Sequence, residues 1–373
     1  MPRPAASAGR GLFASAGMWD ERGMSHPYSD LPANAFWRCG VAEADPAAPA
    51  GIFAPKFGLG RDAAIATAGS CFAQHVGRAL REAGMNVLDA EPPGRGWPPA
   101  LVRAYNYRVY SARYGNIYTS RQLVQLLEDA LEGRVEPAAV WQQDGRFYDA
   151  LRPTVEPRGF ASAEEALALR CTHLAAVRGL FARSSHFIFT LGLTECWADR
   201  ASGRVWPTCP GVVAGSFDPQ RHGFLNLRFG EVLEDLGRAR GLLQGLNPGM
   251  RMILTVSPVP LTATASGGHV LAATARSKAV LRAAADEFAA AHADVDYFPA
   301  YEIVTNPAAR GRFFHPDLRE VTAEGVAAVM GAFLGAHGLA AETGPSRTET
   351  PEPGTDAAEG VVCEEILLEA FRK

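Results

Sequence analysis

Short apolar runs that alternate with helical patterns constrain the fold of this chain more than any other feature. Each run has the length of a strand and is rich in β-branched, large apolar or small residues. Five such runs lie at residues 63–67, 85–89, 186–191, 252–256 and 295–298, and helical patterns lie between them at 72–83, 121–133, 162–182, 229–246 and 276–291. Strands that alternate with helices predict one α/β domain, in which helices cover both faces of a parallel sheet.

The composition limits the classes of partner. Hydrophobic residues make up 47% of the 373-residue chain, which supports a large buried core. The formal net charge of −4 provides no global basic field to attract phosphates, so we expect no nucleic-acid partner. No apolar run approaches the ~18 to 20 residues needed to cross a bilayer, so we also expect no membrane span.

Six cysteines are scattered along the chain without a C-x-x-C pair. This pattern favours neither a zinc site nor a disulfide framework and is typical of reduced thiols in the cytoplasm. The nine histidines lack the i, i+4 or H-x-H spacing of metal ligands, and His173 is expected on the solvent side of its helix. We therefore expect a cytoplasmic protein that holds no metal and no other cofactor.

Three regions are predicted along the chain. Residues 1–23 are expected to form a disordered extension, with Met1 and Met24 both open as the native start. Residues 24–340 form the α/β domain. Residues 341–373 are expected to form a flexible linker, which has few residues to bury, followed by a short C-terminal helix that docks on the body or on a partner.

Ser70 lies where the run at 63–67 gives way to the helix at 72–83. Because the working residues of parallel sheets gather at the carboxyl ends of strands, this junction is a candidate site. The Ser70 hydroxyl could simply cap the helix. Alternatively, it could act as a nucleophile whose oxyanion is stabilised by the helix amino terminus. Cys71 is a rival nucleophile, since the same terminus lowers the pKa of a thiol.

The stretch at 69–73, Gly-Ser-Cys-Phe-Ala, resembles the signature of the GSCFA family. Further blocks agree with that family in order, at residues 114–119, 189–195, 257–261 and 297–303. The family is regarded as similar to the SGNH/GDSL esterases and acyltransferases. The resemblance implies a three-layer α/β/α fold with a mostly parallel, flavodoxin-like (SGNH-type) sheet, and it implies Ser70 as the nucleophile.

The resemblance also implies groups that bind an oxyanion or the substrate. Backbone N–H groups of Ser70 and of Gly115 or Gly192 would hold the oxyanion, and Thr194 takes the place of the third-block Asn. The implied oxyanion-hole or substrate-binding residues are Gly115, Asn116, Gly192, Thr194, Glu195 and Glu302.

The catalytic base is open between two histidines. The late D-x-x-H motif of SGNH enzymes is incomplete, because Arg312 stands three residues before His315. His269, in a Gly-rich loop after the fourth strand, is an equal candidate for the base. Glu302 or Asp317 near either histidine would orient the ring and raise its pKa.

These residues favour acyl transfer through an acyl-Ser70 intermediate, either hydrolysis of an ester or transfer of an acyl group onto a sugar or another hydroxyl. The expected partner is a small-molecule or carbohydrate substrate. The alternative is a non-catalytic ligand-binding (glycan-binding) module on the same fold, which the incomplete late motif favours. The tyrosines and arginines at 103–118 either line the substrate pocket or cover the sheet.

Overall fold

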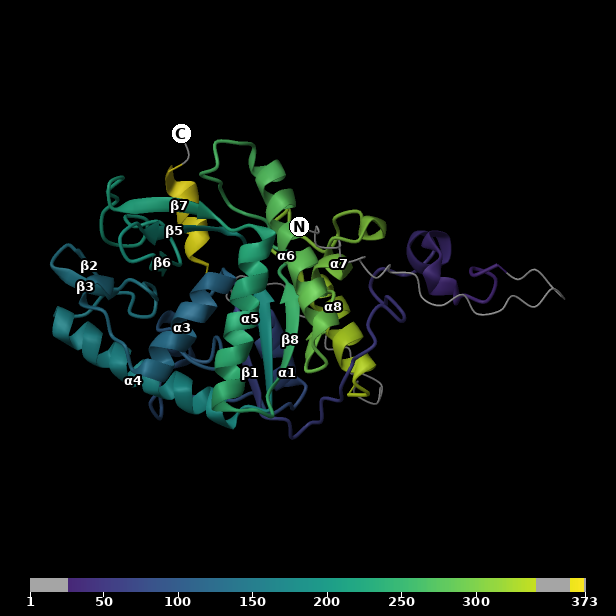
Figure 1. Cartoon of the computed structure of the whole chain (residues 1–373), viewed down its shortest axis with the longest axis horizontal. Helices are drawn as coiled ribbons and strands as arrows, with labels where there is room; N and C mark the ends of the chain where they lie inside the picture. Colours follow the sequence, from purple (N-terminus) through teal and green to yellow (C-terminus); the bar gives the residue numbers. More distant parts are fainter. Residues whose placement is uncertain (1–25, 340–362, 372–373) are drawn as a thin grey trace, which may run out of the picture.

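The computed structural model describes residues 26–339 and 363–371 (Figure 1). At its centre four strands form a parallel sheet in the order β1-β4-β8-β9. These strands are β1 (Ile65–Gly69), β4 (His186–Leu191), β8 (Arg251–Val256) and β9 (Val295–Tyr297). The predicted extension at 1–23 and residues 341–362 of the predicted tail lie outside the described residues.

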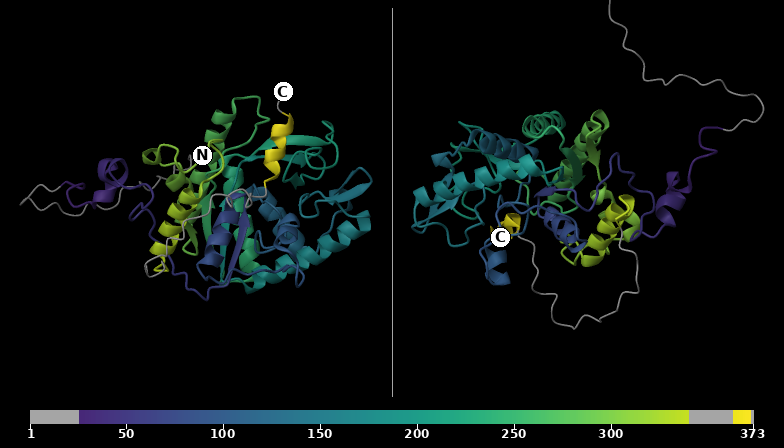
Figure 2. Two further views of the ribbon diagram at one scale, coloured as in Figure 1. Left: turned by 180° about the vertical axis from the view of Figure 1, so that it is seen from behind. Right: turned by 90° about the horizontal axis from the view of Figure 1, so that it is seen from below.

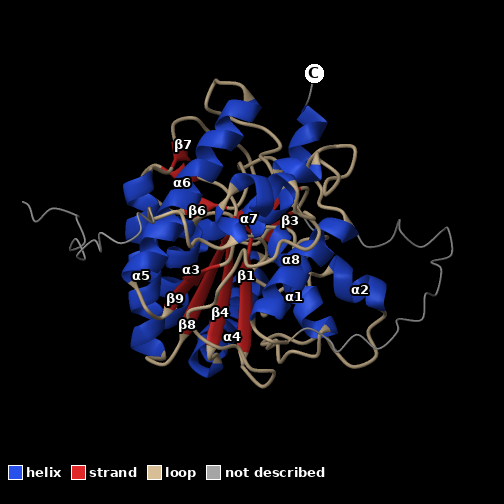
Figure 3. Ribbon diagram, turned by 90° about the vertical axis from the view of Figure 1, so that its right-hand side faces the viewer, coloured by secondary structure: helices blue, strands red, loops and turns tan. Residues whose placement is uncertain are grey.

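Helices cover both faces of the sheet and make it the middle of three layers (Figure 3). One face carries α3 (Ser120–Glu132), α4 (Ala163–Arg183), α5 (Phe229–Leu246) and α6 (Val270–Ala291). The other face carries α1 (Phe72–Glu82), α7 (Ala300–Val304) and α8 (Ala323–Ala336). The arrangement confirms the predicted three-layer α/β/α fold around a parallel sheet.

Side chains of the strands alternate between the two faces, as the two-residue period of a strand requires. In β4, Phe187, Phe189 and Leu191 pack on the side of α3 to α6. Ile188 packs on the opposite side, among residues of α1, α7 and α8. Because both faces are buried, the strand is apolar along its whole length, which is why its sequence was recognisable.

The helices begin at identifiable caps. The Thr119 hydroxyl accepts from the N–H of Gln122 at 3.2 Å and completes a capping box before α3. α6 begins earlier than predicted because His269 caps it, with Nδ1 accepting from the N–H of Leu271 at 3.1 Å.

None of the helices in the described ranges has the length and apolarity to cross a membrane. The remaining short helices are η1 (Ala33–Ala35), η2 (Arg38–Ala42), α2 (Pro99–Ala104), η3 (Pro137–Ala139) and η4 (Pro307–Ala309).

The strand predicted at 85–89 is wrong. Only one parallel bridge forms there, between Val87 and Ile65. Further along β1, the N–H of Thr67 donates to the hydroxyl of Ser111 at 3.0 Å. A loop from later in the sequence therefore pairs with this edge of β1 in place of a neighbouring strand. Nothing in the sequence at 85–89 indicates that these residues would be replaced.

A second, antiparallel sheet stands beyond the carboxyl edge of the parallel sheet (Figure 1). It contains β6 (Val205–Trp206), β5 (Glu195–Asp199) and β7 (His222–Asn226), in that order. A separate hairpin is formed by β2 (Val140–Gln143) and β3 (Arg146–Asp149). The C-terminal 3₁₀ helix η5 (Glu364–Phe371) lies beside the second sheet (Figures 1 and 2).

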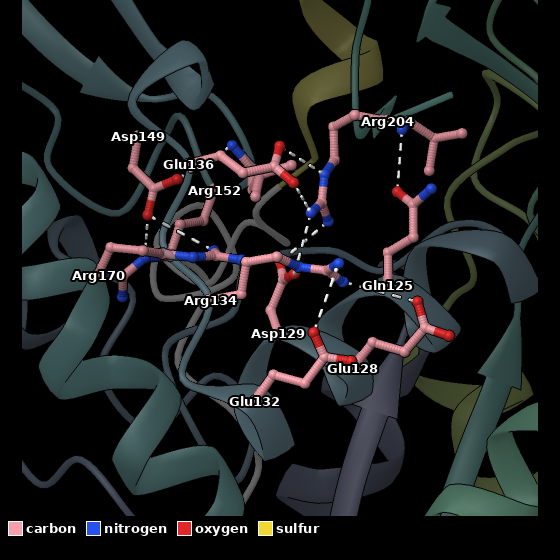
Figure 4. A network of polar contacts seen from close by, with 12 residues as sticks. Gln125, Glu128, Asp129, Glu132, Arg134, Glu136, Asp149, Arg152, Arg170 and Arg204 are labelled. Carbon is pink, nitrogen blue, oxygen red and sulfur yellow. Dashed lines mark hydrogen bonds and ion pairs between the residues drawn. The ribbon is translucent and has the colours of Figure 1, made fainter. Parts of the chain in front are cut away.

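A buried network of ion pairs ties the outer elements to the body (Figure 4). Asp129 of α3 is 1% exposed, and both of its carboxylate oxygens accept from Arg204 at 2.9 Å. Arg134 donates to the same carboxylate at 3.0 Å. Arg170 of α4 lies between Asp129, at 3.4 Å, and Asp149 of β3, at 3.6 Å. The network therefore fixes α4 and the β2–β3 hairpin against α3.

Asp129→Asn is expected to lower the free energy of unfolding by about 3 kcal/mol or more, because it leaves several arginines facing a neutral amide. Urea denaturation followed by circular dichroism measures the change. Glu132→Gln on the same helix is the matched control: its side chain is 58% exposed, and a change below about 0.5 kcal/mol is expected. A loss for Asp129→Asn no larger than that of the control would contradict the role given to this network.

Candidate functional site

The corner between β1 and α1 holds Ser70 in a constrained position. Gly69 has φ of +142°, and a Cβ there would lie 2.4 Å from the carbonyl oxygen of Thr190, so only glycine fits beside β4. Ser70 is 2% exposed, and its Oγ has no hydrogen-bond partner among the described residues. The hydroxyl therefore does not cap α1. Because buried hydroxyls nearly always have a partner, the unpaired hydroxyl keeps this corner a candidate site.

Gly192 faces Ser70 from the segment that follows β4. A Cβ on Gly192 would lie 2.7 Å from the Cβ of Ser70 and 3.0 Å from the carbonyl oxygen of Tyr118, so a side chain there would displace Ser70. The N–H of Gly192 donates to Tyr118 at 3.0 Å, and that of Ser70 donates to Thr190 at 3.1 Å. Both amides are thus bonded to carbonyls in this conformation and are not free to hold an oxyanion here.

Asn116 lies in a buried hydrogen-bond cluster that reaches the backbone of Ser70. Gln74 donates from Nε2 to Tyr110 Oη and to Asn116 Oδ1, at 3.2 Å each. Tyr110 donates from Oη to the carbonyl oxygen of Ser70 at 3.2 Å and also contacts Asn116 Oδ1. The structure therefore brings Asn116 to the Ser70 corner. Its neighbour Gly115 has φ of +68°, which lets the loop turn there.

Thr194 and Glu195 are bound into contacts of their own. The hydroxyl of Thr194 donates to Asn226 Oδ1 at 2.7 Å, which ties the end of β4 to β7. Glu195 accepts from the hydroxyl of Thr264 at 2.7 Å. Both are buried near the carboxyl edge of the sheet, but their described hydrogen bonds do not involve Ser70.

The two predicted histidines do not contact the Ser70 hydroxyl in the described part of the chain. Both are exposed, and the ring of His269 is used as the cap of α6, whereas His315 lies in a surface loop. Glu302 pairs with an arginine of α6, and Asp317 accepts from the N–H of Arg319 at 3.0 Å. Neither carboxylate orients a histidine, so the structure offers no support for a histidine base.

His173 is buried, contrary to the prediction that it faces solvent. Its Nδ1 lies 2.8 Å from a carboxylate oxygen of Glu91. Burial, together with the nearby positive charge of Arg152, lowers the pKa of His173 to about 4. The apolar periodicity of α4 did not reveal this, because the partner of the ring comes from a distant loop.

Lys278 is the residue of the site that sequence reasoning missed. It lies buried on α6, and its Nζ donates to the carbonyl oxygen of Gly192 at 2.6 Å. Burial lowers the pKa of Lys278 to about 8. Gly192 lies directly against Ser70, so the amine binds the backbone of a residue that contacts Ser70, although Nζ makes no hydrogen bond to Ser70 Oγ. The sequence did contain a signal for its burial, because Lys278 lies on the same apolar face of the helix as Leu281 and Ala285.

The start of η5 lies against the same cluster. Glu364 is 1% exposed and accepts from Tyr118 Oη at 2.9 Å and from the hydroxyl of Thr154 at 2.7 Å. It also accepts from the side-chain amide of Asn116. A buried carboxylate is thus satisfied by three donors of the body, which docks the C-terminal helix there.

The two residues on either side of Glu364 also lie close to the corner. A hydrogen bond with Cys363, together with burial, raises the pKa of the Cys71 thiol well above its usual value. A thiol with a raised pKa is a poor nucleophile, which argues against Cys71 as the reactive group. Burial raises the pKa of Glu365 to about 8, and its carboxylate lies 4.0 Å from Arg319.

A pocket of about 910 Å³ adjoins this cluster. It lies between the β6-β5-β7 sheet, the loop at 261–265 and η5. Leu193, which follows Gly192, and Glu365, which lies near Lys278, both belong to its lining. The pocket therefore reaches the surroundings of Ser70, although Ser70 itself is not in its wall.

A model of the GSCFA family matches residues 64–333. The chain belongs to the GSCFA family. The matched range of this GSCFA protein contains Ser70, Gly192 and Lys278, whereas η5 lies beyond it. No curated protein is significantly similar to the chain.

Glu364→Ala is expected to release η5 and expose Cys71, because it leaves three buried donors without their acceptor. Hydrogen bonds to a charged group contribute ~1.5–3 kcal/mol each, so the rate of Cys71 alkylation by iodoacetamide should rise at least about tenfold. Peptide mass spectrometry measures alkylation at Cys71 separately from the other thiols. Glu369→Gln, at an exposed position of the same helix, should leave the rate unchanged. Equal rates for Glu364→Ala and the unmodified protein would show that Glu364 does not hold the helix in place.

Proposed function

We propose that this GSCFA protein is an SGNH-like serine esterase or O-acyltransferase that carries the acyl group on Ser70. The buried Ser70 hydroxyl, without a hydrogen-bond partner in the described chain and at the carboxyl end of β1, is the observation that carries the proposal. An unsatisfied buried hydroxyl is unfavourable by ~1–3 kcal/mol. A nucleophile, however, needs an oxygen that no other group ties down.

Lys278 would take the part that histidine plays in most serine hydrolases. With a pKa of about 8, roughly a tenth of its amine is neutral at pH 7. Serine–lysine pairs occur on unrelated folds. The neutral amine would accept the proton of Ser70 Oγ while that oxygen bonds to the carbonyl carbon of the ester.

In the first half-reaction, collapse of the tetrahedral intermediate breaks the bond to the leaving oxygen, which takes the proton from the Lys278 ammonium. In the second, water or an acceptor hydroxyl gives a proton to Lys278 and attacks acyl-Ser70. Ser70 then leaves with that proton, and the acid or the new ester is released. The positive amino end of α1 would stabilise the oxyanion of both intermediates.

The proposed reaction requires η5 to move away from the cluster. Ser70 Oγ is buried in the docked conformation, and Cys363 and Glu364 lie against the neighbouring Cys71 and Asn116. The docked conformation is therefore assigned to a closed state, and substrate would enter an open one.

Ser70→Ala is expected to abolish labelling by a fluorophosphonate probe. Lys278→Met is expected to lower kcat for p-nitrophenyl acetate by about 10²- to 10⁴-fold, the usual effect of losing a general base. His269→Ala and His315→Ala serve as controls and should change kcat less than about twofold. Labelling that survives Ser70→Ala would remove Ser70 from the mechanism, and inactivation by His315→Ala alone would restore a histidine base.

The pH dependence of kcat/KM should report the Lys278 amine. Because the pKa of Lys278 is lowered to about 8, the neutral fraction rises about tenfold per pH unit below 8 and levels off above it. Hydrolysis rates measured between about pH 6 and 9.5 test this. A midpoint near about 6.5, the ordinary value for histidine, would contradict the assignment.

A non-catalytic ligand-binding module is the second candidate. The burial of Ser70 Oγ and the lack of a contacting histidine in the described residues favour it, because a serine without a base is a weak nucleophile. No turnover across a panel of p-nitrophenyl esters, together with saturable binding of a neutral glycan, would decide for the module.

A further inference from the structure

The pocket beside the Ser70 cluster has aromatic walls. Its volume of about 910 Å³ is that of a small-molecule site. The ring of Trp197 lies 5.1 Å from that of Phe217 and 5.6 Å from that of Phe224, and all three line the pocket together with Trp206. Leu368 of η5 contributes to the lining from the C-terminal helix. Such walls gain free energy by covering apolar surface of a ligand.

The charges of the lining exclude an anionic ligand. No lysine, arginine or histidine of the described residues lines the pocket. Three carboxyl groups do, from Glu195, Glu365 and Glu369, and Glu365 is mostly protonated at pH 7 because burial raises its pKa to about 8. A phosphate or carboxylate would meet no cation in the lining, so the lining favours a ligand without a negative charge.

Two polar side chains of the lining have no hydrogen-bond partner among the described residues. They are Trp206, through Nε1, and Thr262, through Oγ1, and both atoms are buried. Trp206 is 2% exposed. Because both atoms are buried, neither offers a hydrogen bond to a ligand in the pocket. The accessible lining is therefore mostly apolar.

We propose that this pocket binds the acyl part of the substrate, an uncharged aliphatic chain of medium length that packs against the aromatic wall. The assignment of the chain to an acyl group rests on the proposed function. The pocket continues toward the reactive corner through Leu193, the neighbour of Gly192, and through Glu365. With η5 moved away from the cluster, as the proposed reaction requires, a carbonyl carbon at Ser70 would place its chain along the aromatic wall.

Isothermal titration calorimetry of the full chain with straight-chain alkan-1-ols tests the pocket directly. From hexan-1-ol to decan-1-ol the Kd should fall about fourfold per methylene, which corresponds to ~0.8 kcal/mol. Decanoate should bind at least about tenfold more weakly than decan-1-ol.

A matched pair of variants locates the binding. Ala263→Phe fills part of the pocket and should weaken decan-1-ol binding about tenfold or more, whereas Ala293→Phe, on an exposed loop outside the lining, should not. Equal effects of the two variants would overturn the proposal. So would equal Kd values for hexan-1-ol and decan-1-ol, or tighter binding of decanoate or decyltrimethylammonium than of decan-1-ol.

The same titrations on Ser70→Ala separate this inference from the proposed function. The variant should bind decan-1-ol like the unmodified protein, because Ser70 is not in the pocket wall. If the unmodified protein binds decan-1-ol but is not labelled by the fluorophosphonate, the pocket assignment stands and the acyl-serine chemistry is rejected. If it is labelled but does not bind decan-1-ol, the chemistry stands and the pocket assignment is rejected.

Discussion

The candidate site depends on the close approach of two backbones at the carboxyl ends of β1 and β4. Gly69 fits against Thr190, and Gly192 fits against Ser70, only because neither glycine has a side chain. The carbonyl oxygen of Gly192 then holds the amine of Lys278, so one contact positions groups from two strands and from α6. Any side chain at Gly192 would clash with Ser70 and displace the segment whose carbonyl oxygen holds the amine.

Local patterns were sufficient for the parallel sheet and insufficient for the parts built on it. The run at 186–191 is apolar at every position because β4 is buried on both faces, and that signal survives without tertiary information. β6 has only two residues, too few for any periodicity. The edge of β1 is paired by Ser111 rather than by the residues at 85–89, and such a choice between competing partners is made by tertiary packing.

The location of the site followed from sequence better than its chemistry did. The rule of strand carboxyl ends identified Ser70, and the block at 114–119 identified Asn116, which the structure brings to the same corner. No motif pointed to the proposed base, Lys278, because it reaches Gly192 only through the folding of α6, whereas the motif candidate His269 is used as a helix cap. The docking of Glu364 was equally hidden, since all three of its donors lie on remote segments.

The C-terminal helix belongs to the same chain as the site that it covers. In the proposed mechanism it competes with substrate for that site, and its effective concentration at the site does not change when the protein is diluted. Substrate affinity measured on the whole protein would therefore be the intrinsic affinity scaled by the fraction of molecules with η5 undocked. A partner that captured the residues of η5 elsewhere would raise that fraction without touching the strand ends. In the proposed mechanism, access to the site would thus be controlled by the eight residues of η5, which lie outside the family-matched region.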